Sequence, residues 1–132
     1  METFLKILPL IIVILLIFLI REGLSIFGYL KYCKLHVAAK RGDADTVLGL
    51  LKAGHPVNAL DRRFGLTPLH YAVRNGHTDI ARLLIQQGAS LTDPSLHGVT
   101  PLDWYSEFLT PDQQNELLRV AFEKKDKSRQ PS

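Results

Sequence analysis

The chain has 132 residues, 46% of them hydrophobic, and a formal net charge of +3 at pH 7. This length suits one domain and excludes a multi-pass transporter or a large two-domain enzyme. The single cysteine, Cys33, excludes an intramolecular disulfide framework and a cysteine-rich zinc site.

An apolar segment at 4–20 is the first predicted element. Its 17 positions include one charged residue, Lys6, and a single proline. As a helix, a segment of this length rises about 25 Å, close to the roughly 30 Å hydrocarbon core of a bilayer. Arg21 and Glu22 follow directly, where a signal peptide would have small residues at its cleavage site. We therefore predict an uncleaved membrane anchor at 1–22, with a signal peptide and a buried core helix as the alternatives.

A juxtamembrane helix or linker is expected at 23–33, before the polar body of the chain. Within 34–122, nine Lys and Arg residues balance nine Asp and Glu residues, so the body is neutral. Phosphate binding needs a basic surface, and this balance therefore argues against nucleic acid as a partner. The basic residues that follow the apolar segment favour the cytoplasmic side for the body. These residues are Arg21, Lys31, Lys34, Lys40 and Arg41.

The body of the chain repeats itself with an offset of 34 residues. A Leu-His pair occurs at 35–36 and again at 69–70, and the same offset relates two pairs of glycines. A third copy begins at Thr100, which follows Thr67 by 33 residues. A period of this length indicates stacked repeats, each a small unit that buries its apolar face only against its neighbours.

Residues 65–89 read GLTPLHYAVRNGHTDIARLLIQQGA and closely resemble an ankyrin repeat. Residues 35–61 resemble an N-terminal ankyrin repeat without its Thr-Pro start, and 98–122 resemble a C-terminal capping repeat. The resemblance implies an all-α fold, an ankyrin-repeat solenoid of about three helix-turn-helix repeats preceded by a single transmembrane helix. The expected repeats are 34–61, 62–94 and 95–122, followed by a charged flexible tail at 123–132.

Capping residues support these helices independently of the resemblance. Thr67 is placed to cap a helix whose first position is Pro68, where the missing N–H costs nothing. The pair at 100–101 repeats this Thr-Pro device. Thr110 and Gln113 form a capping-box pattern at the start of a last helix.

Glycines and apolar positions complete the predicted repeat. Gly54 and Gly88 suit the left-handed backbone at a helix C-terminus. Leu84 belongs to the apolar stripe of a second helix and is expected between adjacent repeats. The third copy departs from the pattern, because Tyr105 stands at a usually small position and Leu109 replaces the turn glycine. A terminal repeat closes the core on one side, so irregularity is expected there.

No signature of catalysis stands out. The sequence lacks a phosphate-binding glycine-rich loop and the G-x-S-x-G and H-E-x-x-H motifs. His36, His70 and His77 occupy positions where ankyrin repeats use histidine to brace helices and turns. We therefore expect no metal, no cofactor, no small-molecule substrate and no enzymatic activity.

The resemblance implies that a protein partner meets the loop tips and the inner-helix face. Aromatic and arginine side chains are enriched at interface hot spots, and both types occur at these positions. As an alternative, Trp104 and Phe108 pack against the capping repeat. The predicted partner-binding residues are Arg62, Arg63, Phe64, Tyr71, Arg74, Asn75, His97, Trp104 and Phe108.

We predict a membrane-anchored adaptor that binds a protein partner at the bilayer surface. One alternative is an exported, membrane-anchored inhibitor or immunity protein that blocks a toxic enzyme. A second is a subunit of a membrane complex whose apolar helix packs against other helices. An enzyme is the third class, and nothing in the motifs above favours it.

Overall fold

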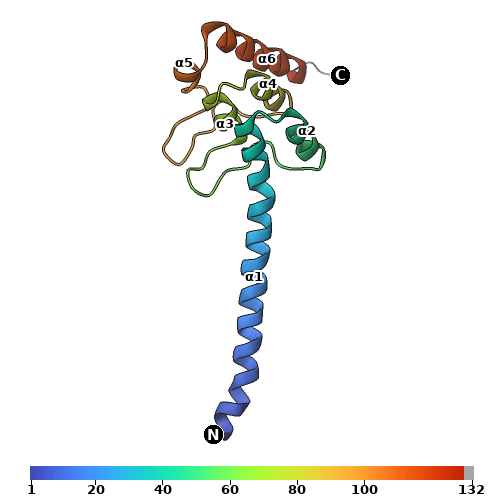
Figure 1. The fold of residues 1–132 in the computed structure, drawn as a ribbon, viewed down its shortest axis with the longest axis vertical. Coiled ribbons are helices and arrows are strands. Elements are labelled where there is room, and N and C mark those ends of the chain that lie inside the picture. Colours follow the sequence, from blue (N-terminus) through green and yellow to red (C-terminus); the bar gives the residue numbers. More distant parts are fainter. Residues whose placement is uncertain (130–132) are drawn as a thin grey trace. The chain divides into compact units, whose positions relative to one another are not determined.

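The computed structural model describes residues 1–129, and of residues 22–32 it describes the backbone alone. No strand occurs among residues 1–129, and the predicted all-α class is confirmed. The helices are α1 (Glu2–Arg41), α2 (Ala44–Lys52), α3 (Pro68–Arg74), α4 (Thr78–Gln86), α5 (Tyr105–Phe108) and α6 (Pro111–Arg129) (Figure 1).

The chain divides into two compact units, Met1–Lys31 and Tyr32–Ser132. The first unit lies within α1, and its side chains at 1–21 are all exposed. The stretch Glu2–Arg21 has a mean hydropathy of 3.0 and is long and apolar enough to cross a bilayer. This stretch is therefore a candidate membrane span by length and composition. The side chains of the predicted juxtamembrane segment 23–33 lie outside the described residues, except for a half-buried Cys33.

Caps fix where the short helices of the second unit begin. Thr67 Oγ1 accepts a hydrogen bond from His70 N–H at 3.4 Å, and Thr67 N–H donates to His70 Nδ1 at 3.0 Å. Pro68 takes the first position of α3, as predicted. At the start of α6, Thr110 N–H donates to Gln113 Oε1 at 3.0 Å, which confirms the predicted capping box.

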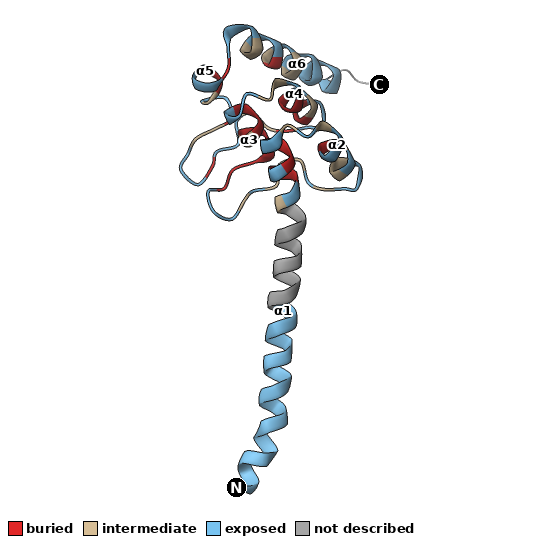
Figure 2. Ribbon diagram, viewed as in Figure 1, coloured by how far each residue is buried: buried red, intermediate tan, exposed pale blue. Residues whose placement is uncertain are grey.

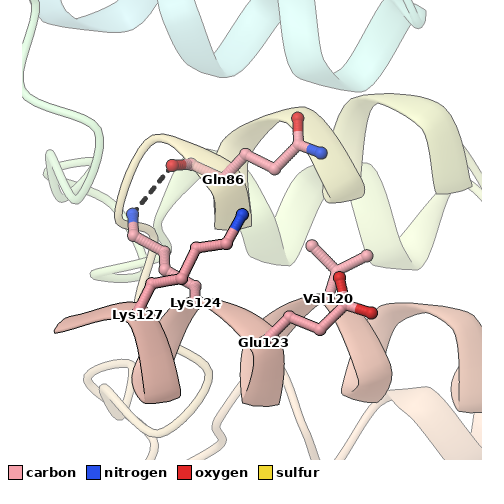
Figure 3. A pocket seen from close by; sticks show the side chains of 5 residues that line it. All are labelled: Gln86, Val120, Glu123, Lys124 and Lys127. Carbon is pink, nitrogen blue, oxygen red and sulfur yellow. Dashed lines mark hydrogen bonds between the residues drawn. The ribbon is translucent and has the colours of Figure 1, made fainter. Parts of the chain in front are cut away.

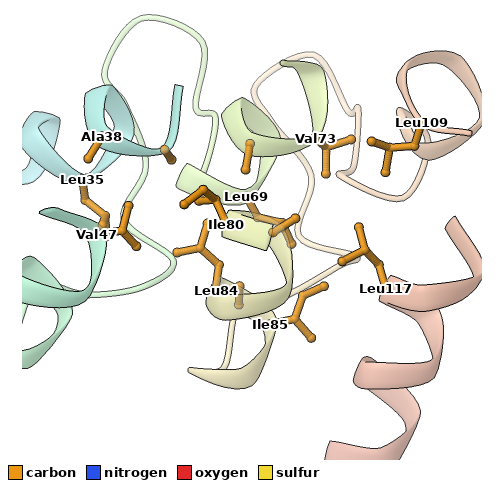
Figure 4. Close-up of a cluster of buried hydrophobic side chains, with 14 of the residues drawn as sticks. Leu35, Ala38, Val47, Leu69, Val73, Ile80, Leu84, Ile85, Leu109 and Leu117 are labelled. Atoms are coloured by element: carbon orange, nitrogen blue, oxygen red, sulfur yellow. The ribbon is translucent and has the colours of Figure 1, made fainter. Parts of the chain in front are cut away.

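The apolar core of the second unit runs through all the repeats (Figure 4). Helix α4 packs against α2, α3 and α6, so its apolar stripe lies at the centre of the stack. Leu84 of α4 is fully buried, which confirms its predicted position. Most buried positions lie on the helices of the second unit, whereas its loops combine exposed, intermediate and buried positions (Figure 2). The fully buried core residues include Leu35, Val47, Leu69, Ile80, Leu84 and Leu117.

A close backbone approach joins the first repeat to the second. Gly42 follows α1 with φ 77°, a conformation that favours glycine. A β-carbon at Gly42 would lie 2.8 Å from Cε1 of His77. The same imidazole places Nε2 3.0 Å from the carbonyl oxygen of Lys40. A residue other than glycine at position 42 would therefore have to displace His77, which precedes α4.

The third repeat is more irregular than the sequence predicts. Residues 101–104 form turns rather than a helix, and α5 covers only Tyr105–Phe108. Leu109 stands where the second repeat has a glycine, and it adopts extended backbone with φ −120° and ψ 146°. The chain therefore leaves α5 without the left-handed turn that ends α3 at Gly76.

Helix α6 continues to Arg129 and so extends into the segment 123–132, where the sequence predicts a flexible tail. Lys124 of α6 donates through Nζ to the carbonyl oxygens of Ile85 at 3.3 Å and Gln86 at 2.8 Å. These carbonyls lie at the end of α4, where a cation is favoured by the helix dipole. This attachment gives the end of α6 a partner within the domain. Residues 130–132 lie outside the described residues.

Candidate protein-binding surface

Two extended loops carry the predicted tip residues. Finger 1, residues 57–66, belongs to the connection between α2 and α3, and finger 2, residues 90–99, to the connection between α4 and α5 (Figure 1). In finger 1, Asp61 Oδ1 accepts hydrogen bonds from the backbone N–H of Arg63 at 2.9 Å and of Phe64 at 2.6 Å. This turn shapes the tip around the aspartate.

Finger 2 is closed by a serine in a similar way. Ser95 Oγ accepts from the backbone N–H of Val99 at 3.2 Å and of His97 at 3.3 Å. Ser95 N–H in turn donates to the carbonyl oxygen of Val99 at 2.8 Å. Both fingers are thus held by side-chain oxygens that bind backbone donors of their own loop.

The two fingers lie against each other. Leu96 N–H donates to the carbonyl oxygen of Phe64 at 3.0 Å, and the Phe64 and His97 rings lie 6.4 Å apart between centroids. A β-carbon at Gly65, which has φ 64°, would lie 2.7 Å from Cγ of Leu96. The guanidinium of Arg63 lies over the Phe64 ring, 4.9 Å from its centroid. The structure therefore brings the predicted tip residues of both loops together.

Tyr71 of α3 is tied to finger 1. Its hydroxyl donates to Asp61 Oδ2 at 2.7 Å, and its ring meets the His36 ring edge-on at 5.7 Å. Burial and the hydrogen bond to Asp61 raise the pKa of Tyr71 to about 12. The half-buried ring is therefore less available to a partner than its sequence position predicts.

Opposing effects act on Asp61. Burial raises the pKa of its carboxyl group, but hydrogen bonds from Phe64 N–H, the Tyr71 hydroxyl and Arg63 N–H outweigh burial, so that the pKa is lowered. The carboxylate is ionised at neutral pH and accepts three donors. Asp61 therefore fixes the turn of finger 1. The one clue to this role in the sequence is the position of an aspartate two residues before Arg63.

Trp104 is at the centre of an aromatic row on the inner-helix face. Its ring meets the His70 ring edge-on at 5.3 Å and the Phe108 ring edge-on at 5.8 Å. The Arg74 guanidinium lies 5.9 Å from the centroid of the Trp104 ring. Trp104 is half-buried and packs against the core, whereas Arg74 and Phe108 are exposed. The predicted partner-binding role of Trp104 and its alternative role in the cap are thus compatible.

Asn75 has a local structural contact. Its Nδ2 donates to the carbonyl oxygen of Tyr71 at 2.7 Å, at the end of α3. The side chain is exposed. The nine predicted residues accordingly fall into two sets. The tip group is Arg62, Arg63, Phe64 and His97, and the inner-helix group is Tyr71, Arg74, Asn75, Trp104 and Phe108.

The histidine beneath Trp104 is held in one tautomer. His70 Nδ1 accepts from Thr67 N–H at 3.0 Å, so the proton resides on Nε2, which lies 3.0 Å from the carbonyl oxygen of Val99. Burial lowers the pKa of His70 below its ordinary value of 6.5. The neutral imidazole therefore joins the start of α3 to the end of finger 2.

Several exposed apolar side chains were not among the predicted site residues. Leu60 and Leu96, on the two fingers, are 57% and 70% exposed. Phe122 of α6 is 64% exposed and lies outside the predicted binding face. Their residue types alone do not distinguish them from core residues, because exposure depends on the fold.

A pocket of about 300 Å³ lies between the end of α4 and α6 (Figure 3). Lys124 extends across it to the carbonyl oxygen of Gln86. Its walls combine one apolar side chain, Val120, with charged and amide groups. Among the described residues no group of three His, Cys, Asp or Glu side chains is placed to hold a metal ion. The residues that line the pocket are Gln86, Val120, Glu123, Lys124 and Lys127.

Comparisons with known proteins concern the repeats. A family model described as ankyrin repeats in three copies matches residues 35–126. The chain is 32% identical to human ARF GTPase-activating protein GIT1 over 94 residues, 71% of this chain and 12% of that protein. It is 40% identical to acyl-CoA-binding domain-containing protein 2 of Arabidopsis thaliana over 60 residues, 46% of this chain and 17% of that protein. It is 41% identical to mouse 2-5A-dependent ribonuclease over 64 residues, 48% of this chain and 9% of that protein.

Proposed function

Because the chain belongs to the ankyrin-repeat family, we propose that it is an adaptor that binds a protein partner and is held at a membrane by its apolar N-terminal helix. Ankyrin repeats are protein-interaction domains, and the repeats account for most of the second unit. The activities in the names of its relatives belong to those much longer proteins.

The observation that carries the proposal is the row formed by Arg74, Trp104 and Phe108. A guanidinium and two aromatic rings lie in sequence on one face, within 6 Å of their neighbours. Trp, Tyr and Arg are the residue types that dominate interface hot spots, because they bury a large area and retain polar contacts. We assign the inner-helix group to the protein partner, with Trp104 as the anchor residue.

The N-terminal helix supports the second half of the proposal. Its exposed apolar surface covers Glu2–Arg21, a length that suits a bilayer. A signal sequence has the same length and composition, but the Arg21-Glu22 pair does not resemble a cleavage site. An anchor confines the repeats to the membrane surface and raises the effective concentration of partners that are also there. The basic residues after the helix favour the cytoplasmic side.

The side chains of the inner-helix face favour binding over catalysis. Arg74 and Phe108 are exposed, and the histidine that contacts Trp104, His70, has both ring nitrogens engaged with Thr67 and Val99. Such a face offers contact area and a positive charge rather than a poised acid, base or nucleophile. We therefore propose binding without chemistry.

A photocrosslinking experiment in native membranes tests the proposal. A benzophenone amino acid in place of Phe108 is expected to capture a discrete protein, since Phe108 is 37% exposed beside Trp104. The same replacement at Phe122, which is 64% exposed on α6, is the matched control and is expected to capture little. Equal capture from the two positions would show that the inner-helix face is not the preferred surface.

A further inference from the structure

We propose that the tips of the two fingers form a docking surface for an anionic lipid bilayer. The surface, here called the tip platform, comprises Leu60, Arg62, Arg63, Phe64, Leu96 and His97. This inference rests on the proposed membrane anchor. It divides the predicted partner-binding residues between two partners, the inner-helix group for a protein and the tip group for lipid headgroups.

The platform is unusually apolar for a solvated loop. Leu60 is 57% exposed, Leu96 is 70% exposed and Phe64 is 37% exposed. Loop tips normally carry small and polar residues, because an exposed apolar side chain gains nothing in water. Leu and Phe side chains on protruding tips can insert at the boundary between headgroups and acyl chains, as do those of interfacial helices.

The charges of the platform suit phosphate-bearing headgroups. Arg62 and Arg63 are exposed beside the apolar side chains. The carboxylate of Asp61 is directed inward, where it binds the Tyr71 hydroxyl and the backbone of its own finger. Asp93 is the one exposed carboxylate among the described residues of the two fingers, so the two exposed arginines outnumber it. Juxtamembrane arginines are attracted to the negative surface of a membrane rich in anionic lipids.

Finger 1 is bound to the beginning of the second unit. His36 places Nε2 2.8 Å from the carbonyl oxygen of Ala59 and 3.0 Å from that of Leu66, so the base of finger 1 lies beside His36. His36 is near the start of the part of α1 that belongs to the second unit, whose first residue is Tyr32. The base of finger 1 is therefore tied to one of the first residues of the second unit.

A short connection keeps the second unit close to the proposed anchor. The segment 22–31 separates the candidate span from Tyr32, and even fully extended it bridges no more than about 40 Å. A domain confined to that distance samples the membrane surface at high effective concentration. Weak contacts by a few side chains are then sufficient to hold the platform on the bilayer.

The platform is preorganised for this role. Leu96 N–H binds the carbonyl oxygen of Phe64, and Asp61 and Ser95 each fix the turn of their own finger. Docking therefore requires little additional ordering of the backbone, which lowers the entropy cost of binding.

Hydrogen exchange of the full-length chain in lipid nanodiscs tests the proposal. Nanodiscs of phosphatidylcholine alone are compared with nanodiscs that contain about one-third phosphatidylserine, with no other protein present. We expect amides of the two fingers to exchange about tenfold more slowly on the anionic discs, whereas amides of α2 and α6 remain unchanged. The double variant Arg62→Glu/Arg63→Glu and the double variant Leu60→Ser/Leu96→Ser are each expected to lose this protection. Because these side chains are exposed, the variants should keep the melting temperature of the native chain.

The control is the double variant Lys52→Glu/Lys125→Glu, which makes the same change of charge at exposed positions on α2 and α6. It is expected to retain the protection of the fingers. Equal exchange of the fingers on both kinds of disc would overturn the inference while leaving the anchor intact. Protection that appears only after a membrane-protein extract is added would assign the tips to a protein partner and would also overturn it. Failure of the chain to enter either disc would contradict the anchor, and with it the docking proposal.

Discussion

Replacing Leu84 with alanine tests the packing of the repeats. Leu84 is fully buried, with 0% of its surface accessible to solvent. Helix α4, which carries Leu84, packs against α2, α3 and α6. Leu→Ala removes three buried carbon atoms, a transfer cost of about 2.4 kcal/mol at 0.8 kcal/mol per carbon. The cavity left among three helices adds to this cost, so we expect a loss of about 3–4 kcal/mol in the free energy of unfolding.

Urea denaturation of the fragment 23–132, followed by circular dichroism, measures this loss. Leu96→Ala is the matched control, because it removes the same atoms from a side chain that is 70% exposed. It should change the free energy of unfolding by less than about 0.5 kcal/mol. A loss below about 0.5 kcal/mol for Leu84→Ala as well would refute the stacking of α4 at the centre of the core.

Three further outcomes are expected. Because burial lowers the pKa of His70, the unfolded chain takes up a proton on this imidazole at a higher pH than the folded domain does, so stability should fall as pH decreases below about 6.5. Urea midpoints at several pH values measure this fall, and an identical pH dependence in His70→Gln would show that His70 does not contribute. The full-length chain should stay with membranes through alkaline carbonate washing while the fragment 23–132 is soluble, and a mature N-terminus beyond Ile20 by mass spectrometry would contradict an uncleaved anchor. A C-terminal alkaline phosphatase fusion should be inactive in an exported compartment, and an active fusion would favour the exported inhibitor.

Local sequence patterns predicted the repeat framework well. The offset between the Leu-His pairs located the helix pairs, and the Thr-Pro device located the start of α3. Gly54 and Gly88 have φ values of 85° and 104°, as expected for left-handed residues after helices. These features depend on neighbours within one or two turns, which is why the sequence reveals them.

The detail of the binding surface was less predictable, because it depends on contacts between segments far apart in the chain. Tyr71 is a predicted interface residue, but its hydroxyl is engaged in a hydrogen bond to Asp61 and its ring is half-buried. The bond from Leu96 to Phe64 joins two loops that the sequence treats separately. The extent of α6 depends likewise on Lys124, whose partners lie in α4. Periodicity and propensity carry no information on such pairs.

The central claim is tested most directly by two affinities of the captured partner, one for the native fragment 23–132 and one for the same fragment with Trp104→Ala. Trp104 connects Arg74 and Phe108 on the inner-helix face, so its truncation should weaken binding by about 2 kcal/mol, roughly 30-fold. Phe122→Ala is the control for loss of an exposed aromatic ring and should leave the affinity unchanged. Melting temperatures measured in parallel separate binding from folding. Unchanged affinity with a large loss of stability in Trp104→Ala would contradict the account and would place Trp104 in the capping repeat alone.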